Sequence, residues 1–198
     1  MNSKQLRPNF YHDTELKNII FNQKDIMQRL RYLRQIHAHA YLSAGVIRNL
    51  VWSTLHQQNY DLITTEIDVI FFDPDEKLQQ ISQQLKQQLT AKFPKNEWDV
   101  VNQAMVHKWY KTDNNQSIPA YLSLFDALSM WPETATAIAI RFAKNDALEI
   151  IAPFGLDDLF SLKLRWNPRL VSHKIFMQRI ESKDFLRRWP KLQFIDQS

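Results

Sequence analysis

Hydrophobic residues in this chain recur with two periods, one typical of helices and one typical of strands. Apolar positions three or four residues apart predict helices over residues 14–36, from 45 to about 57 and from 73 to about 91. Runs of β-branched and aromatic residues predict strands at 39–43 and 66–72. The first half of the chain is therefore expected to form a helix, a strand, a tight turn, a helix, a strand and a further helix.

The second half continues with strands and shorter helices. Residues 97–110 are typical of one or two strands, 122–131 of a short helix and 171–189 of a mostly helical segment. Residues 134–142 and 147–154 have the pattern of a β-hairpin. Because strands alternate with helices and include a hairpin, we expect an α+β fold with a mixed central β-sheet flanked by helices.

The length of the chain favours a single domain. Its 198 residues lie within the usual size of one domain, and the sequence shows no internal repeat or linker. We expect one unit over residues 1–198, with a core at about 38–165, N-terminal helices at 14–36 and a C-terminal helical segment at 171–189.

Composition excludes several classes of protein. Hydrophobic residues make up 44% of the chain and charged residues 23%, which is typical of a folded domain and not of a disordered chain. No apolar run approaches the roughly 18 residues that span a bilayer, and the first residues lack the apolar stretch of a signal peptide. The chain has no cysteine, which excludes disulfides and thiolate metal sites. These features predict a cytoplasmic protein without a membrane partner.

Charge and glycine content narrow the choice of ligand. A net charge of +4 permits an anionic partner such as a nucleotide but does not require a polynucleotide. Basic residues cluster between 165 and 188, where the simplest interpretation is a solvated helical face. With only Gly45 and Gly155, the chain contains neither a GxxxxGK phosphate loop nor a GxGxxG dinucleotide motif. A nucleotide site in this chain must therefore be built in another way.

Two carboxylates on one expected strand are the strongest chemical signal. Glu66 and Asp68 are two residues apart, so their side chains point to the same face of the strand. Their neighbours are apolar, and acids seldom lie in a buried strand without a positive partner. Mg²⁺, which binds one or two carboxylates together with substrate phosphates, is the usual partner. The alternative is a solvent-facing strand surface. A third carboxylate could come from Asp99 or Glu149, and the sequence does not choose between them.

The second signal is the segment LSAGVIRN at residues 42–49. A strand, a tight turn and a helix direct backbone N–H groups and the positive end of the helix at a ligand beyond the turn. We expect Gly45 to allow the sharp turn and the close approach of a phosphate, and Arg48 to add a forked cation. The alternative is that Gly45 only relieves local strain.

Together the two signals resemble a known signature. The segments SAGVIRNLVW and TEIDVIFFD resemble the GGxVRD…DxD motif of the polymerase β-like nucleotidyltransferases. The segments TATAIAI and LEIIAPFGLDDL resemble the TINAMA…DPFGGLEDL stretch in the head domain of CCA-adding enzymes and bacterial poly(A) polymerases. The whole pattern is similar to a small bacterial family of nucleotidyltransferase-like proteins. The resemblance covers residues from about 40 to 165 and implies the polymerase β-like nucleotidyltransferase fold.

This resemblance implies binding of a nucleoside triphosphate (NTP) with Mg²⁺ at a two-metal site, and transfer of the nucleotidyl group to an unknown hydroxyl acceptor. It implies catalytic and metal-binding roles for Glu66 and Asp68. Nucleotide binding is implied for the turn and the start of the following helix, namely Ser43, Ala44, Gly45, Arg48 and Asn49. The RNA-binding body of the larger enzymes has no counterpart in the matched segments, so no dedicated RNA-binding domain is expected.

Four departures from the signature favour an alternative, a degenerate member that binds a nucleotide or a protein without turnover. Ala44 replaces the first glycine, Asn49 replaces an acid and Glu66 replaces the first aspartate. Residues 130–133 stand where the family has its RRD element. The intact charge of the Glu66/Asp68 pair favours an enzyme.

Overall fold

A mixed five-stranded sheet forms the centre of the computed structural model, which describes residues 10–195 apart from 64 and 77–79. The strand order is β3-β2-β1-β4-β5. β1 runs antiparallel to β2 and β4, β2 and β3 are parallel, and β4 and β5 form the expected hairpin. A second, two-stranded parallel sheet joins β6 to β7. The strands are β1 (Tyr41–Ser43), β2 (Glu66–Phe71), β3 (Glu97–Asn102), β4 (Ala139–Phe142), β5 (Leu148–Ile151), β6 (Lys163–Arg165) and β7 (Gln193–Ile195).

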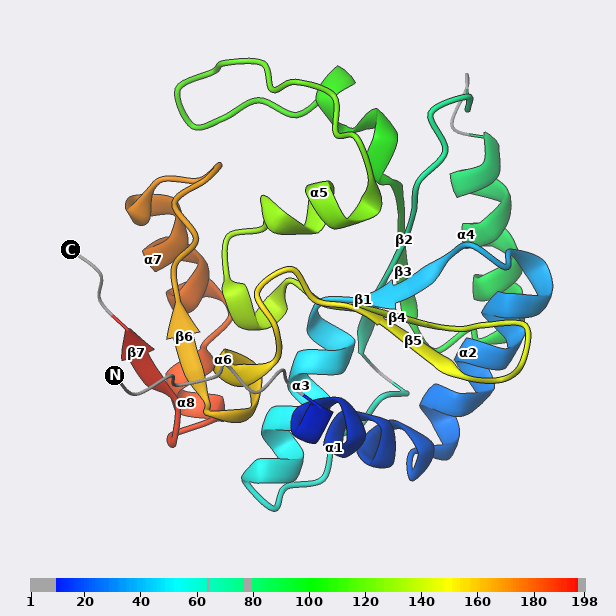
Figure 1. Ribbon diagram of the computed structural model, residues 1–198, viewed down its shortest axis with the longest axis horizontal. Helices are drawn as coiled ribbons and strands as arrows, with labels where there is room; N and C mark the ends of the chain where they lie inside the picture. The colour runs from blue at the N-terminus through cyan, green and yellow to red at the C-terminus, as the bar shows by residue number, and fades with distance from the viewer. Residues whose placement is uncertain (1–9, 64, 77–79, 196–198) are drawn as a thin grey trace, which may run out of the picture.

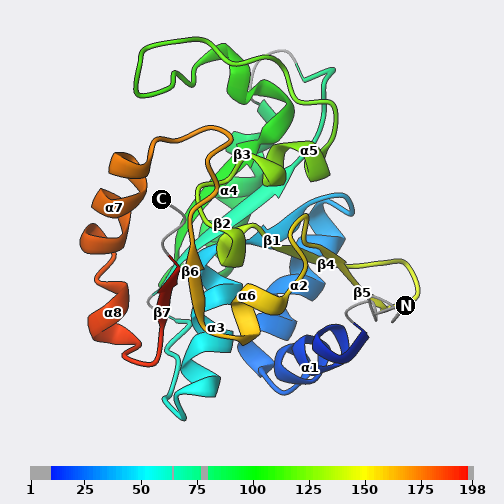
Figure 2. The same ribbon diagram turned by 60° about the vertical axis from the view of Figure 1, so that its left-hand side comes forward.

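Helices cover both faces of the five-stranded sheet (Figure 1). Helices α1 to α4 and α6 contribute to the main hydrophobic core on one face, and α5 packs on the other face. Figure 2 shows α7 and α8 along the side of β6 and β7. The helices are α1 (Phe10–Phe21), α2 (Lys24–Ile36), α3 (Gly45–Leu55), α4 (Gln80–Lys92), α5 (Leu124–Ser129), α6 (Asp157–Phe160), α7 (His173–Ser182) and α8 (Phe185–Arg188), with 3-10 turns η1 (Gln103–Lys108) and η2 (Thr134–Thr136). The expected α+β class with a mixed central sheet is therefore confirmed.

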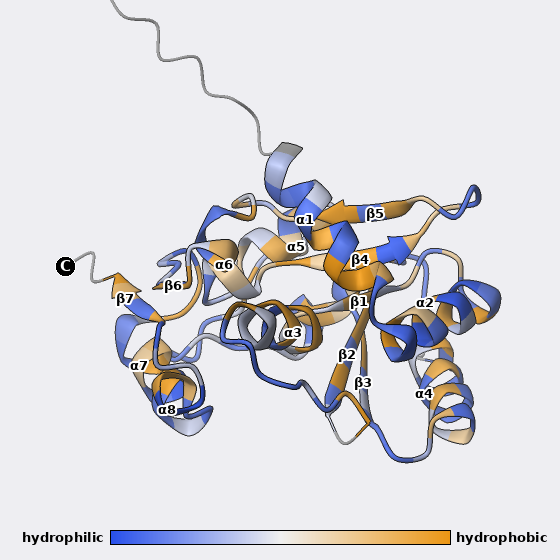
Figure 3. Ribbon diagram, turned by 90° about the horizontal axis from the view of Figure 1, so that it is seen from below, coloured by the Kyte–Doolittle hydropathy of each residue, from blue (hydrophilic) through white to orange (hydrophobic). Residues whose placement is uncertain are grey.

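Apolar residues gather where the helices meet the sheet. Figure 3 shows hydrophobic residues along the strands and on α3, whereas the outer faces of α2 and α4 are largely hydrophilic. Within the described part of the chain, no helix combines the length and the apolar character needed to cross a membrane.

Strand β2 is an inner strand of the sheet and lies next to the strand that leads into Gly45. Its residues Ile67, Val69 and Phe71 belong to the main core, whereas Ile70 packs with α5 on the opposite face. Glu66 and Asp68 share the face of Ile70, because residues two apart on a strand point the same way. The carboxylate pair is therefore on one side of the sheet.

The N-terminal helical region expected at 14–36 consists of two helices, the first of which already includes Phe10. α1 ends at Phe21, and α2 begins after Gln23, whose backbone is extended with φ −103° and ψ 95°. Asn22 stands at the break, and asparagine favours turns over helix interiors because its side chain competes for backbone hydrogen bonds. Each helix still buries its own apolar stripe against the main core.

The helix expected to start at Asp73 begins later in the chain. The Asp73 carboxylate accepts a hydrogen bond from the N–H of Asp75 at 2.9 Å, so it closes a local turn. The Glu76 carboxylate accepts from the N–H of Ile81 at 2.8 Å, in the first turn of α4. Residues 77–79 lie outside the described part. A carboxylate thus caps this helix, but it is supplied by Glu76.

Residues 97–110, expected to form one or two strands, form one strand followed by a 3-10 turn. The side chain of Asn102 accepts from the N–H of Ala104 at 3.1 Å and donates to the carbonyl of Asp73 at 2.7 Å. Such side-chain bonds to the backbone compete with the strand ladder, so the chain leaves the sheet after Asn102. The helical segment near the C-terminus is confirmed as α7 and α8, which are separated at Asp184 (φ 55°), while β7 was not expected.

Candidate active site

The sharp turn between β1 and α3 is made by Ala44, and not by Gly45 as expected. Ala44 has φ 55° and ψ −122°, a region that glycine normally occupies. Its N–H donates to the Ile138 carbonyl at 3.0 Å, which fixes the turn against the chain leading into β4. Gly45 follows as the first residue of α3, without a positive φ. Backbone strain thus falls on the position where the nucleotidyltransferase signature has its first glycine.

Gly45 brings the N-terminus of α3 against Asp68. Its backbone N–H donates to the Asp68 carboxylate, and the positive end of the helix stabilises the charge there. A Cβ at Gly45 would lie 3.6 Å from Nη2 of Arg48 and 4.0 Å from Oδ2 of Asp68, which are ordinary contact distances. The close approach at this position is therefore between a helix terminus and a carboxylate, and an alanine would fit the available space.

Three carboxylates meet on the same face of β2 and β3. Asp68 pairs in register with Asp99 across the parallel strands, and Glu66 lies two residues before Asp68. Burial raises the pKa of Asp68 to about 6, and the charges of Glu66 and Asp99 add to the rise. The Gly45 N–H and the Arg179 guanidinium oppose it. The repulsion between these acids is thus only partly compensated by the protein, and a cation would relieve it.

The acids do not form a complete metal cage. Among the residues that the structure describes, no group of three or more His, Asp or Glu side chains is close enough to hold an ion. Glu66 is half exposed, and its Oε2 lies 3.9 Å from Nζ of Lys183, the residue that follows α7. Mg²⁺ commonly takes one or two carboxylates and completes its shell with water and substrate phosphates. The Glu66/Asp68 pair fits that kind of partial site.

Glu149, the other candidate for a third carboxylate, lies outside the site. It is on β5, where its Oε2 accepts from Nε of Arg141 at 2.6 Å. β1 and β4 separate β5 from β2, which corresponds to roughly 14 Å at the usual strand spacing. The fold therefore brings Asp99, and not Glu149, beside Asp68.

Arg48 is buried at the start of α3, with only 3% of its surface exposed. Its Nη1 donates to Oγ1 of Thr136 at 2.8 Å, and its Nη2 donates to Oδ1 of Asn49 at 2.9 Å. The guanidinium also lies over the ring of Phe185, 4.4 Å from the centroid. Burial lowers the pKa of Arg48 to about 10, and the charge of Glu133 opposes this change. Arg48 therefore stays charged at neutral pH, and Asn49, which replaces an acid, holds it in place.

Glu133 links two arginines at the site and was missed by the sequence analysis. It is fully buried. Its Oε2 accepts from Oγ1 of Thr136 at 2.6 Å and lies 3.5 Å from Nη1 of Arg48. Its Oε1 accepts from Nε of Arg179 at 2.5 Å. The signal in the sequence was an acid among apolar residues at the place of the missing RRD element, but its partners are far away in the chain.

A cleft of about 640 Å³ opens beside Asp68. A smaller hollow of about 230 Å³ shares Asp68 and Arg179 with the cleft, and Asp99 lines only the smaller one of these two. Ser43 is fully buried and lines neither of them, and Ala44 lines the smaller hollow. The cleft is lined by Gly45, Arg48, Asn49, Ser53, Gln58, Asn59, Tyr60, Asp61, Thr65, Glu66, Asp68, Arg179, Lys183, Arg188 and Trp189.

Part of the basic cluster at 165–188 faces this cleft, which corrects the interpretation as a solvated face. Arg179, Lys183 and Arg188 line the cleft. Arg187 is 85% exposed and pairs with Asp184 within its own segment. A signal was available, because Arg179 and Lys183 are four residues apart and share one face of the helical segment.

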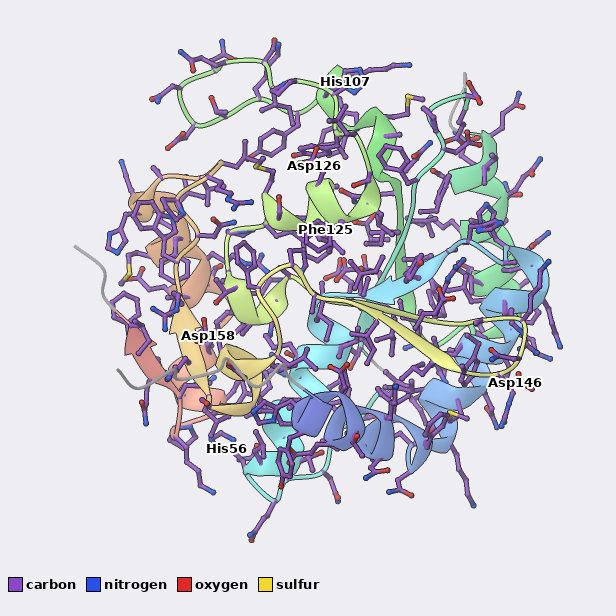
Figure 4. The ribbon with its side chains drawn as sticks, viewed as in Figure 1. His56, His107, Phe125, Asp126, Asp146 and Asp158 are labelled. Atoms are coloured by element: carbon purple, nitrogen blue, oxygen red, sulfur yellow. The ribbon has the colours of Figure 1, made fainter. Side chains whose placement is uncertain are left out.

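Other charged residues have structural roles away from the cleft. Figure 4 shows Asp158 on α6 and Asp146 at the turn between β4 and β5. Asp158 accepts from Nε of Arg165 at 2.8 Å and from Oγ1 of Thr134 at 2.7 Å. It therefore ties α6 to β6 and η2, in agreement with a structural role for this acidic segment.

The fold is that of a nucleotidyltransferase. The sequence profile of a family described as nucleotidyltransferase matches residues 33–194. Because the match covers most of the chain, the protein belongs to this nucleotidyltransferase family.

Solved structures with the same fold are CCA-adding enzymes or parts of them. One, reported as an NMR structure that reveals a CCA-adding enzyme head domain, is 27% identical with a TM-score of 0.77, over 92% of this chain and 95% of that one. An apo CCA-adding enzyme is 14% identical with a TM-score of 0.58, over 91% of this chain and 44% of that one. The complex of a CCA-adding enzyme with CTP is 13% identical with a TM-score of 0.56, over 91% and 43%. The chain thus spans less than half of these two enzymes, which show the fold alone. No curated protein sequence matches the chain.

Proposed function

We propose that this protein transfers a nucleotidyl group from a magnesium-bound NTP to a hydroxyl acceptor. The observation that carries the proposal is the meeting of Asp68 with the N-terminus of α3 in a cleft lined by cations. In this reaction the acceptor oxygen bonds to the α-phosphorus, the bond from that phosphorus to the β-phosphate oxygen breaks, and pyrophosphate leaves. Carboxylates for a metal beside cations for phosphates support this chemistry.

We assign phosphate binding to the turn after β1 and the first turn of α3. Backbone N–H groups at a helix N-terminus bind phosphate oxygens, and Gly45 leaves them accessible. Arg48 adds positive charge at the cleft wall, and Asn49 orients it. Ser43 and Ala44 contribute by shaping the turn, since Oγ of Ser43 lies 3.3 Å from the Asp68 carbonyl and Ala44 sets the direction of α3.

We assign metal binding to Glu66 and Asp68. Mg²⁺ bound there would act as a Lewis acid that lowers the pKa of the acceptor hydroxyl and stabilises the leaving pyrophosphate. The raised pKa of Asp68 supports a cation at this place, because it reflects burial and repulsion from neighbouring acids. Asp99 is our candidate for the third carboxylate, and it lines the smaller hollow, where an acceptor would approach.

Nucleotide binding without turnover is the second candidate. Strain at Ala44 and the Lys183 ammonium beside Glu66 favour it, since a lysine there neutralises the acid without a metal. The CTP complex of a CCA-adding enzyme of the same fold supports an NTP as the ligand in either case.

A thermal-shift screen of the four NTPs with and without Mg²⁺ tests the proposal first. A ligand at 100 times its Kd stabilises a protein by about 2.7 kcal/mol, which is readily measured. The Asp68→Asn variant should lose the magnesium-dependent shift, and Asp146→Asn, at the exposed β4–β5 turn, should keep it. Transfer is then followed by release of pyrophosphate from the NTP that binds. A magnesium-dependent shift in Asp68→Asn equal to that of the wild type would contradict the proposal, and binding without release of pyrophosphate would favour the second candidate.

A further inference from the structure

We propose that α7 and α8 form a polyphosphate-binding wall, in which Arg179, Lys183 and Arg188 bind the β- and γ-phosphates of the NTP. The inference rests on the proposed function and concerns the same cleft. These three cations line the cleft together with Gly45, although they follow β1 and α3 by more than a hundred residues in the chain. They lie outside every segment to which the sequence signature assigns nucleotide binding.

Arg179 is the anchored member of this wall. Its Nε donates to fully buried Glu133, which also contacts Arg48. About a third of the Arg179 side chain stays exposed, and the residue lines both the cleft and the smaller hollow. Asp68 is the other residue common to these two linings. A phosphate at this junction would meet a guanidinium that is already held in place, whose planar fork suits phosphate oxygens.

Lys183 and Arg188 complete the wall on the open side of the cleft. Lys183 lies 3.9 Å from Glu66, and both side chains are about half exposed. Such a pair is weak, so the ammonium can exchange the carboxylate for a phosphate once Glu66 has another cation. Arg188 lies over the ring of Trp189, 4.4 Å from its centroid. Trp189 is buried and donates from Nε1 to Oγ of Ser53 at 3.2 Å, which fixes the end of α8 on α3.

The placement of the other basic residues argues against a diffuse polyanion surface. Arg187, next to Arg188, is 85% exposed and pairs with Asp184. Arg165 is bonded to Asp158. An extended surface for a nucleic-acid backbone would use the exposed Arg187, whereas Arg179, Lys183 and Arg188 line a cleft of about 640 Å³, a volume typical of a small-molecule site.

Calorimetric titration with inorganic tripolyphosphate tests the wall without a need for turnover. Arg179→Ala should weaken binding by about 10-fold or more, because it removes charge-assisted hydrogen bonds. Lys183→Ala and Arg188→Ala should each weaken it by several-fold. Arg187→Ala is the matched control and should bind as the wild type does. Arg179→Lys should recover part of the affinity, since a point charge replaces the fork.

Three results would overturn the inference. The first is that the wild-type protein does not bind tripolyphosphate, and the second is that a folded Arg179→Ala variant binds it with unchanged affinity. The third is that Arg187→Ala loses as much affinity as Arg179→Ala, which would indicate a diffuse surface such as RNA requires. Circular dichroism and melting curves establish folding, and Arg179→Lys serves if Arg179→Ala unfolds. Failure of the proposed function is distinct: tripolyphosphate binding that depends on Arg179 without nucleotidyl transfer keeps the wall and removes the enzyme. Conversely, an Arg179→Ala variant that transfers nucleotidyl groups with an unchanged KM for NTP would remove the wall and keep the enzyme.

Discussion

The two halves of the five-stranded sheet differ in the residues that lie opposite their acids and in the residue type that takes a positive φ at their turns. In the β4–β5 half, Glu149 lies opposite Arg141 and bonds to it, and the turn gives a positive φ to Asp146, a residue type that tolerates it. In the β2–β3 half, Asp68 lies opposite Asp99, and the turn after β1 places Ala44 in a region typical of glycine. The repulsion lies on β2 and β3 and the strain at the turn beside them, and neither is found at the β4–β5 hairpin.

We propose that this difference separates a structural half from the half that carries the candidate site. A basic residue opposite Asp68, or a glycine at 44, would remove the cost, as the β4–β5 half illustrates. Strained backbone costs on the order of 1–3 kcal/mol and tends to persist where it is part of a mechanism. We therefore interpret the β2–β3 half as the place where stability is given up for ligand binding.

The largest change in stability is expected when the buried acid Glu133 is compared with the partly exposed Glu149 of the β4–β5 half. Glu133→Ala leaves Arg48 without its carboxylate partner in the interior, so the free energy of unfolding should fall by about 3–5 kcal/mol. Glu149→Ala breaks a partly exposed pair and should cost about 1 kcal/mol or less. Urea unfolding of both variants measures the difference. Similar losses of stability in Glu133→Ala and Glu149→Ala would mean that burial does not determine how much these ion pairs contribute to stability.

A gain in stability is expected from the opposite change at Asp68. Its folded-state pKa, raised to about 6, lies above the ordinary value of 3.8, so the stability linked to the protonated form is complete below pH 3.8 and is lost as the pH rises through 6. Asp68→Asn should therefore raise the free energy of unfolding by about 1–2 kcal/mol at pH 7 and change it little at pH 3.5. Urea unfolding without divalent metal at both pH values tests this. A loss at pH 7 would show that Asp68 is already well paired.

A smaller gain is expected from relief of the turn. Ala44→Gly removes the strain of a positive φ and should raise the free energy of unfolding by about 1 kcal/mol, after the entropic cost of glycine in the unfolded state. Asp146→Gly, at the corresponding turn of the other half, should change it by less than about 0.5 kcal/mol. Urea midpoints are compared for both. A loss in Ala44→Gly would mean that the alanine methyl group packs favourably enough to offset the strain.

The smallest effect is expected at Gly45. Gly45→Ala adds a methyl group at ordinary contact distances and at a helical position, so the free energy of unfolding should stay within about 0.5 kcal/mol of the wild type. Thermal melting measures it, with Ala44→Gly as the reference for a strained position. A drop in the free energy of unfolding of more than about 1 kcal/mol would mean that Gly45, and not Ala44, makes the sharp turn, and it would weaken the comparison of the two halves of the sheet.

Local patterns predicted much of the fold. The helix α3, the strand β2 that follows it and the β4–β5 hairpin follow from periodicity and residue type. The common face of Glu66 and Asp68 follows from the alternation of side chains along a strand. The sharp turn was also predicted, but the residue that takes the positive φ is decided by a hydrogen bond from Ala44 to the distant Ile138, which the local sequence does not contain.

Partners far apart in the chain could not be predicted. The choice between Asp99 and Glu149 depends on strand order, because both residues lie on expected strands with similar patterns. The network of Glu133 with Arg48 and Arg179 joins three separate segments, so no local spacing reveals it. For the same reason the sequence did not distinguish the inward Arg179 from the exposed Arg187.

The packing of α8 on α3 has a consequence for how the protein is made. The Trp189 ring lies 5.3 Å from that of Trp52, and Phe185 lies 5.7 Å from it, so α8 closes the core over α3. At about 5–20 residues per second, a ribosome adds α8 on the order of ten seconds after α3. Until then the aromatic face of α3 lacks its cover, and Arg179, Lys183 and Arg188 are missing from the cleft as well. The nascent chain therefore acquires a closed core and the proposed polyphosphate-binding wall in the same late step of translation.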